Sequence, residues 1–477
     1  MKSYLSLSEI RQDITTGTIN CVGLVNNYLK RIEEKKELNA FLEVFSEEAL
    51  SKAVEVDRKI KEGKAGRLAG MVIGIKDVIC YKDHKVSGSS RILKGFTSLY
   101  TATALQRLLD EDVIVIGRLN CDEFAMGGSN ENSAYGNVLN PINTEFVPGG
   151  SSGGSAAAVK AGLCHATLGS DTGGSIRQPA SYCDIVGIKP SYGRISRYGL
   201  MAYASSFDQI GPLTNSVEDA ALLLEIMAGQ DEYDSTVSSE PVAAYTKLLN
   251  KKDKQRFAYI KECLESDGVD PEIKIRMQEI IDELKKDGHT VEAVSFPLLE
   301  YLVPTYYVLT TAEASSNLSR YTGVLYGQRS PKSNDTNSTY FSSRSEGFGK
   351  EVKRRIMLGT FVLSAGYYDA YYAKAQKMRR RILDITTEIL VDYDFILLPT
   401  APKTAFRFGE NTDPVAMYLE DIFTVQANLT GLPAISLPVG QHSNGMPFGI
   451  QLIGRKFEEG NLLAAGHDMC KKLRVLA

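Results

Sequence analysis

Glycine and serine crowd into one stretch of this chain, residues 148–179, with the sequence PGGSSGGSAAAVKAGLCHATLGSDTGGSIRQP. Glycine pairs frame serines there twice, at 149–154 and at 173–175. Such pairs cost backbone entropy, so they accumulate where the chain must adopt positive φ or bring bare N–H groups close to another group. Beside a serine hydroxyl, that group is a substrate carbonyl. The stretch therefore predicts a nucleophilic serine.

Ser175 is the nucleophile that this pattern favours. The three residues before it, Thr172, Gly173 and Gly174, can turn successive N–H groups toward one point, as an oxyanion hole requires. A serine hydroxyl also needs a base, which is most often histidine. The five histidines of the chain lie in no motif typical of a catalytic histidine.

A lysine offers the alternative base. Lys76 follows the β-branched run 71–75, MVIGI, which predicts a buried strand with a lysine at its exit. Burial disfavours the ammonium form and lowers the pKa, so a lysine placed there can accept a proton. Taken alone, such a lysine is more often a solvated edge residue.

Lys76, GGSSGGSAAAV and SDTGGSIRQP together resemble the amidase signature family, whose members use a Ser-cisSer-Lys triad. The resemblance places the nucleophile on Ser175, the base on Lys76, and the bridging serine, which follows a cis peptide bond, on Ser151. It implies amide hydrolysis through an acyl-enzyme. It also implies an α/β fold, a single α/β/α domain with a large mixed sheet covered by helices on both faces.

Further segments resemble one subgroup of that family, the A subunits of glutamyl-tRNA(Gln) amidotransferases. They are FAMGGSNENSAYGNVLNP, VGIKPSYGRISRYGL, SSFDQIGPLT, VPTYYVL, FGKEVKRRIMLGT and DPVAMYLEDI. The resemblance implies a glutaminase that supplies ammonia to a B subunit, which binds misacylated Glu-tRNA(Gln) and uses ATP and magnesium. A small C subunit would complete a heterotrimer, and tRNA would be bound only indirectly. No cofactor or metal is expected in this chain, which has no P-loop.

A glutamine pocket needs a cation for the carboxylate and an anion for the ammonium. The resemblance places these on Arg355 and Asp421, with Tyr306 and Ser129 lining the pocket. Without the resemblance, Arg355 and Asp421 would be interpreted as helix-surface residues and Ser129 as an ordinary loop serine.

Three alternatives remain open. Residues 150–154 satisfy G-x-S-x-G, so Ser152 could be the nucleophile elbow of an α/β-hydrolase, although the preceding segment is polar and proline-punctuated. The chain could be a stand-alone amidase for small amides, or a scaffold that has lost its activity. Two departures from the family pattern, Lys160 and Asp184, lie outside the triad, and we expect Lys160 on a solvated helix face.

Charge and composition limit which binding partners and which cellular compartment we expect for this protein. The chain has 54 basic and 58 acidic residues, a net charge of −4, which gives no global attraction for nucleic acid. The basic run Lys374, Lys377, Arg379, Arg380 and Arg381 predicts a solvated helix face and a weak candidate partner surface. The seven cysteines do not have the spacing of metal ligands, and the sequence shows no apolar leader and no apolar run long enough to span a membrane. These observations predict a cytoplasmic enzyme without membrane contact.

The chain divides by pattern into four segments. Residues 1–65 are expected to be helical, 66–240 and 386–477 to form the catalytic core, and 240–385 to be a peripheral elaboration that contributes pocket residues. Ser6-Leu7-Ser8-Glu9 predicts a capping box at the start of the first helix, and Asp270-Pro271 predicts the start of a helix that ends near Gly288. Asn444-Gly445 predicts a hairpin, which we expect at an antiparallel C-terminal sheet edge. Residues 327–347, rich in Ser, Asn and Thr, predict a mobile loop that could act as a lid or partner contact.

Overall fold

The computed structural model describes residues 2–251, 253–411 and 413–473. Its centre is an 11-stranded mixed sheet in the order β1-β3-β2-β4-β6-β5-β10-β11-β9-β7-β8. The strands are β1 Phe41–Val44, β2 Val72–Lys76, β3 Ile114–Leu119, β4 Ala166–Asp171, β5 Val186–Lys189, β6 Gln209–Thr214, β7 Arg256–Ile260, β8 Thr290–Val294, β9 Phe395–Pro399, β10 Ala434–Gln441 and β11 Pro447–Gly454.

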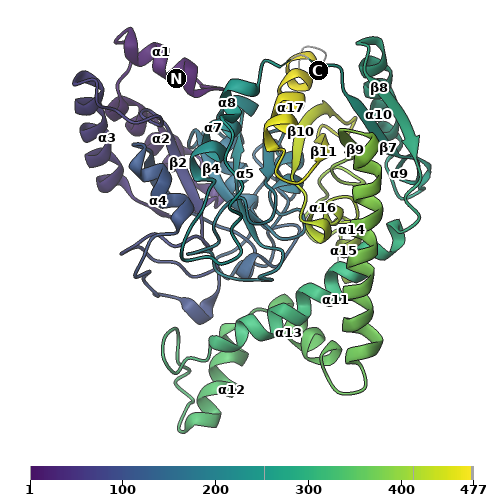
Figure 1. Cartoon of the computed structure of the whole chain (residues 1–477). Coiled ribbons are helices and arrows are strands. Elements are labelled where there is room, and N and C mark those ends of the chain that lie inside the picture. Colours follow the sequence, from purple (N-terminus) through teal and green to yellow (C-terminus); the bar gives the residue numbers. More distant parts are fainter. Residues whose placement is uncertain (1, 252, 412, 474–477) are drawn as a thin grey trace.

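Helices pack on both faces of the sheet, which confirms the predicted α/β architecture (Figure 1). On β11, an added Cβ at Gly449 would meet Ser181 of one helix, and at Gly454 it would meet Leu462 of another. Positions five apart on a strand point to opposite faces, so the two helices cover opposite sides. The helices are α1 Leu7–Thr15, α2 Cys21–Glu34, α3 Ser46–Lys61, α4 Thr103–Asp110, α5 Gly153–Lys160, α6 Arg177–Tyr182, α7 Val217–Met227, α8 Tyr245–Leu248, α9 Lys261–Glu265, α10 Pro271–Lys286, α11 Leu299–Asn317, α12 Thr336–Gly347, α13 Lys350–Val362, α14 Lys374–Asp392, α15 Pro414–Leu419, α16 Val425–Thr430 and α17 Glu459–Leu473.

The predicted hairpin is present, but its place in the sheet was wrong. Strands β10 and β11 pair antiparallel around a turn in which Gly445 has φ +83°. They lie inside the sheet, because β9 pairs with β11 and the parallel strands β7 and β8 extend the sheet beyond it. The edge is therefore β8, which follows the predicted helix α10 with its Asp270 cap.

The N-terminal segment is not wholly helical. Ser6 caps α1 by accepting from the Glu9 N–H, as predicted, and α2 follows with its apolar face buried. Strand β1, however, pairs antiparallel with β3 at the other sheet edge. A strand of four residues is too short to show a periodic pattern in the sequence. It forms because it pairs with a strand more than 70 residues further along the chain.

Helices α11, α12 and α13 form an arm that projects from the body (Figure 1). The prediction of a loop over 327–347 was wrong for its C-terminal half, where α12 spans Thr336–Gly347. Asp335 and Ser338 form a reciprocal capping box at its start. Because α12 buries only three of its residues, it lacks the apolar periodicity that identifies helices in a sequence.

The basic run at the start of α14 is helical, but it is not uniformly solvated. Arg379 donates from Nε to Leu429 O at 2.9 Å and from Nη2 to Ser206 O at 3.0 Å. Its guanidinium also lies 4.1 Å from the centre of the Phe207 ring. Arg379 therefore ties α14 to the core. No described helix combines the length and apolarity needed to span a membrane.

Candidate active site

Lys76 ends β2, a central strand that is buried along its whole length between β3 and β4. Its Nζ donates to Ser151 Oγ at 2.7 Å, Ser152 Oγ at 2.8 Å and Ser170 Oγ at 3.0 Å. Among the described residues, the other fully buried lysine, Lys189, donates to two backbone carbonyls and to the side-chain carbonyl of Gln209. Hydroxyl groups can pass a proton on and carbonyls cannot, so of these two lysines only Lys76 is placed to act as a base.

Burial lowers the pKa of Lys76 to about 8, and the nearby Cys121 thiol and the carboxyl groups of Asp122, Asp171 and Asp208 oppose this shift. About a tenth of such a lysine is neutral at pH 7, so a proton acceptor is present near neutrality. The position of the lysine at a buried strand end, predicted from the sequence, is confirmed.

The two serine segments lie side by side at the end of this strand. The Gly150–Ser151 peptide bond is cis, as the resemblance implies. The Ser152 N–H, just before α5, donates to Ser175 O at 3.2 Å. Lys76 and Ser151 are fully buried, whereas Ser175 keeps 9% of its surface exposed. Ser175 is therefore the most exposed of the three triad residues.

The glycine pair before Ser175 is needed because two side chains lie against it. An added Cβ on Gly173 would lie 2.4 Å from Tyr306 Oη, and one on Gly174, where φ is +128°, would lie 2.3 Å from Thr424 Oγ1. The Gly174 N–H donates to Asp171 Oδ1 at 2.9 Å. That predicted oxyanion donor is already engaged, which leaves the N–H groups of Thr172 and Gly173.

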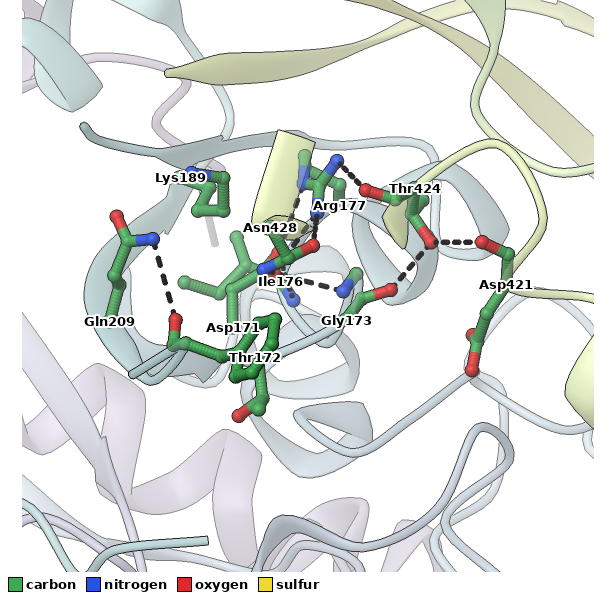
Figure 2. Close-up of polar contacts among 12 residues, drawn as sticks. Asp171, Thr172, Gly173, Ile176, Arg177, Lys189, Gln209, Asp421, Thr424 and Asn428 are labelled. Atoms are coloured by element: carbon green, nitrogen blue, oxygen red, sulfur yellow. Dashed lines mark hydrogen bonds and ion pairs between the residues drawn. The ribbon is translucent and has the colours of Figure 1, made fainter. Parts of the chain in front are cut away.

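A buried ion pair supports this turn, and sequence reasoning missed it. Asp171, at the end of β4, binds Arg177 through both carboxylate oxygens (Figure 2). Burial alone would raise the pKa of Asp171, but the charge and hydrogen bonds of Arg177 hold that pKa below its ordinary value. The partners that hold Arg177 in turn lie 247 to 274 residues further along the chain, namely Thr424 O, Asn428 Oδ1 and Gln451 Oε1.

Arg355 is buried on the inner face of α13, not exposed as an isolated helical arginine would be. Its Nε pairs with Glu351 at 2.8 Å and its Nη1 donates to Tyr203 Oη at 2.9 Å. The rings of Tyr203, Tyr307 and Tyr418 each lie between 5.2 and 5.6 Å from the guanidinium. Two of the three guanidinium nitrogens are engaged, so a carboxylate would be bound from Nη2.

Asp421 lies at the start of the turn that leads into α16, beside the same aromatic residues. It accepts from Tyr307 Oη at 2.8 Å, and Tyr307 stacks on Tyr418 with ring centres 3.9 Å apart. Burial raises the pKa of Asp421 to about 7, opposed by the Tyr307 hydrogen bond and by the charge of Arg355. Tyr307, which sequence reasoning did not select, therefore joins the two predicted glutamine-binding charges.

Ser129 lies in a buried loop against the cis peptide bond. An added Cβ on Gly150 would lie 2.7 Å from the Ser129 N and 2.2 Å from Asp122 Oδ2. Asp122 is fully buried and accepts from the Asn130 N–H at 2.9 Å. The structure thus brings Ser129 next to the triad segment, although its sequence context gives no signal beyond the resemblance.

The two departures from the family pattern pair with each other. Lys160 Nζ lies 2.5 Å from Asp184 Oδ2, and both side chains are partly exposed, so Lys160 is not simply solvated. The α/β-hydrolase alternative lacks its strand, because residues 141–151 form turns and loop before Ser152. Ser152 instead accepts from Lys76 and donates to Ser170 O.

A family model described as Amidase matches residues 23–463 of this chain. The chain belongs to the amidase family. The A subunit of the glutamyl-tRNA(Gln) amidotransferase of Chlorobium phaeobacteroides is 50% identical over 464 residues, 96% of this chain and 97% of the relative. The corresponding protein of Brevibacillus brevis is 48% identical, and the match covers 97% of this chain and 95% of that protein.

Solved structures of amidase-family proteins agree with the fold. The A subunit of the glutamyl-tRNA(Gln) amidotransferase of Thermotoga maritima is 42% identical, with a TM-score of 0.77, over 92% of this chain and 89% of that one. The peptide amidase of Stenotrophomonas maltophilia is 27% identical, with a TM-score of 0.81, over 97% and 96%. One scaffold thus serves both a peptide amidase and amidotransferase subunits.

Proposed function

We propose that this chain is the glutaminase subunit of a glutamyl-tRNA(Gln) amidotransferase. The observation that carries the proposal is the buried Lys76 bonded to Ser151, beside the segment that carries Ser175, with a cation and an anion in one nearby aromatic cluster. Relatives of about 50% identity over nearly the whole chain carry that subunit name, whereas the peptide amidase is 27% identical.

In the proposed reaction, Ser175 Oγ attacks the side-chain amide carbon of glutamine. The serine proton passes through Ser151 to neutral Lys76, which is 2.7 Å from the Ser151 hydroxyl. The N–H groups of Thr172 and Gly173 stabilise the oxyanion, typically by about 3 to 4 kcal/mol for each donor. The relay then returns the proton to the nitrogen as the C–N bond breaks and ammonia leaves. Water hydrolyses the acyl-enzyme to glutamate.

Glutamine is selected by charges that a simple amide does not need. Arg355 binds the α-carboxylate from Nη2 of its guanidinium, and ionised Asp421 binds the α-ammonium. Tyr306 closes the pocket over Gly173, and Ser129 lines it beside Gly150. The site therefore excludes amides that lack either the α-carboxylate or the α-ammonium of glutamine. With such an amide, the buried charge of Arg355 or of Asp421 would remain unpaired.

The ammonia is passed to a B subunit that activates misacylated Glu-tRNA(Gln) with ATP and magnesium, and a small C subunit completes the heterotrimer in the cytoplasm. The subunit name of the relatives supports a multi-subunit enzyme. The net charge of −4 supports tRNA contact through the partner rather than through this chain.

A glutaminase assay of the isolated chain and of the chain with its partners, with and without charged tRNA, tests this proposal. We expect two further polypeptides to copurify and glutamine-dependent amidation of Glu-tRNA(Gln) by the complex. Full turnover of simple uncharged amides by the isolated chain, with no copurifying partner, would favour a stand-alone amidase.

The pH dependence of glutamine hydrolysis tests the two titrating groups. Lys76 must be neutral, and its pKa is about 8, so kcat/KM should rise about tenfold per pH unit up to pH 8 and then level. Asp421 must be ionised, and its pKa is about 7, so the slope should steepen below pH 7. Asp421→Asn should remove only the lower step. A flat profile between pH 6 and 8 would contradict the lysine base.

A further inference from the structure

Two consecutive buried acids, Asp122 and Glu123, follow strand β3 and form hydrogen bonds with two different segments of the chain. Asp122 faces the triad: its N–H donates to Ser151 O at 3.2 Å and its carboxylate lies against Gly150. Glu123 faces the arm: its Oε2 accepts from the Gly349 N–H at 2.8 Å. The pair therefore connects the cis peptide segment to the junction between α12 and α13 in the arm.

Gly349 immediately precedes α13, the helix that carries Arg355. An added Cβ on Gly349 would lie 2.4 Å from Glu123 Oε2, so the carboxyl group sits tightly on the N–H of the residue that precedes this 13-residue helix. Burial raises the pKa of Glu123 to about 7, and the hydrogen bonds from Ser90 and from the Gly349 N–H oppose this shift. The Ser90 hydroxyl donates to the other oxygen of Glu123.

The next residue strengthens the contact with the arm. Phe124 stacks on Tyr321 with ring centres 5.0 Å apart and packs edge-on against Phe348 at 5.8 Å. Phe124 and Ala125 have φ of 49° and 60°, a left-handed conformation that non-glycine residues seldom adopt. Strain of this kind persists only where the surrounding contacts determine it, and it is concentrated at functional sites.

The proposed glutaminase reaction does not account for these contacts, since neither Glu123 nor Phe124 faces the triad or the two pocket charges. We propose that Asp122–Phe124 is a clasp in which Glu123 is a positioning residue. It fixes the start of α13, and so sets Arg355 at the right place relative to Ser175. This inference rests on the proposed role of Arg355 in binding the substrate carboxylate.

Glutamine kinetics of Glu123→Ala test the clasp. We expect KM to rise about tenfold, while kcat changes by less than about threefold, because only the carboxylate contact is displaced. Glu123→Gln keeps the shape and one acceptor and should give a smaller rise. Glu346→Gln, an exposed glutamate of α12 three residues before Gly349, is the matched control and should match the parent.

A double-mutant cycle separates positioning from general support. If Glu123 acts through Arg355, the double variant with Arg355→Ala should be no more than about twofold worse than Arg355→Ala alone. Multiplied effects, or a fall in kcat as large as the rise in KM, would overturn the clasp. Thermal denaturation checks folding, and if Glu123→Ala does not fold, Glu123→Gln enters the cycle instead.

The cycle also separates this inference from the proposed pocket. If Arg355→Ala leaves the KM for glutamine unchanged, the assignment of Arg355 is wrong, whatever Glu123 does. If Arg355→Ala raises KM and neither Glu123 variant does, the pocket stands and the clasp is wrong.

Discussion

Ser175→Ala should abolish glutamine hydrolysis while the assembled complex still amidates Glu-tRNA(Gln) with free ammonia. Without the hydroxyl no acyl-enzyme forms, and removal of a catalytic nucleophile typically costs about 10⁴-fold or more. Ammonia supplied from solution replaces the missing product. The measurement is a paired assay of the same complex with glutamine or with an ammonium salt as nitrogen donor.

The ammonia-dependent rate serves as the internal control for folding and assembly in that experiment. Ser175 is nearly buried, and alanine fits the same space because it differs from serine only by lacking the hydroxyl group. Loss of both activities would indicate that Ser175 maintains the structure. Retention of glutamine-dependent activity would remove Ser175 from the mechanism and return attention to Ser152.

Lys76→Arg should lower the kcat of glutamine hydrolysis by about 10²- to 10⁴-fold, because this is the usual contribution of a general base. A guanidinium keeps the positive charge and can donate to Ser151, but it cannot deprotonate near neutral pH. The kcat of glutamine hydrolysis, measured with saturating glutamine, gives the result.

Lys76→Met is the informative comparison. If Lys76 acts as a base, both variants should lose activity to a similar extent. If it acts only as a fixed charge for Ser151 or the oxyanion, arginine should retain much of the rate and methionine should be far worse. Because Lys76 is fully buried among hydroxyls, the larger guanidinium can strain the strand end, so thermal unfolding of each variant must be measured as well.

Some features of this protein were readable from the sequence because their causes are local. A β-branched run that ends in Lys76 becomes a buried strand, Asn444-Gly445 supplies the positive φ of a hairpin, and Ser6 and Asp270 cap the helices that follow them. The glycine pair before Ser175 likewise predicts a close approach of backbone and side chains. The division of the chain at 65, 240 and 385 stays a prediction.

The sequence by itself determined which residues carry the proposed chemistry, and the tertiary structure decided what holds them there. Arg177 finds its partners about 250 residues away, and Arg355 is enclosed by rings from three separate segments. β1 exists only because β3 offers an edge, and α12 only because its cap and the arm support a polar sequence. Contacts between distant segments leave no periodic trace in the chain, so packing alone specifies them.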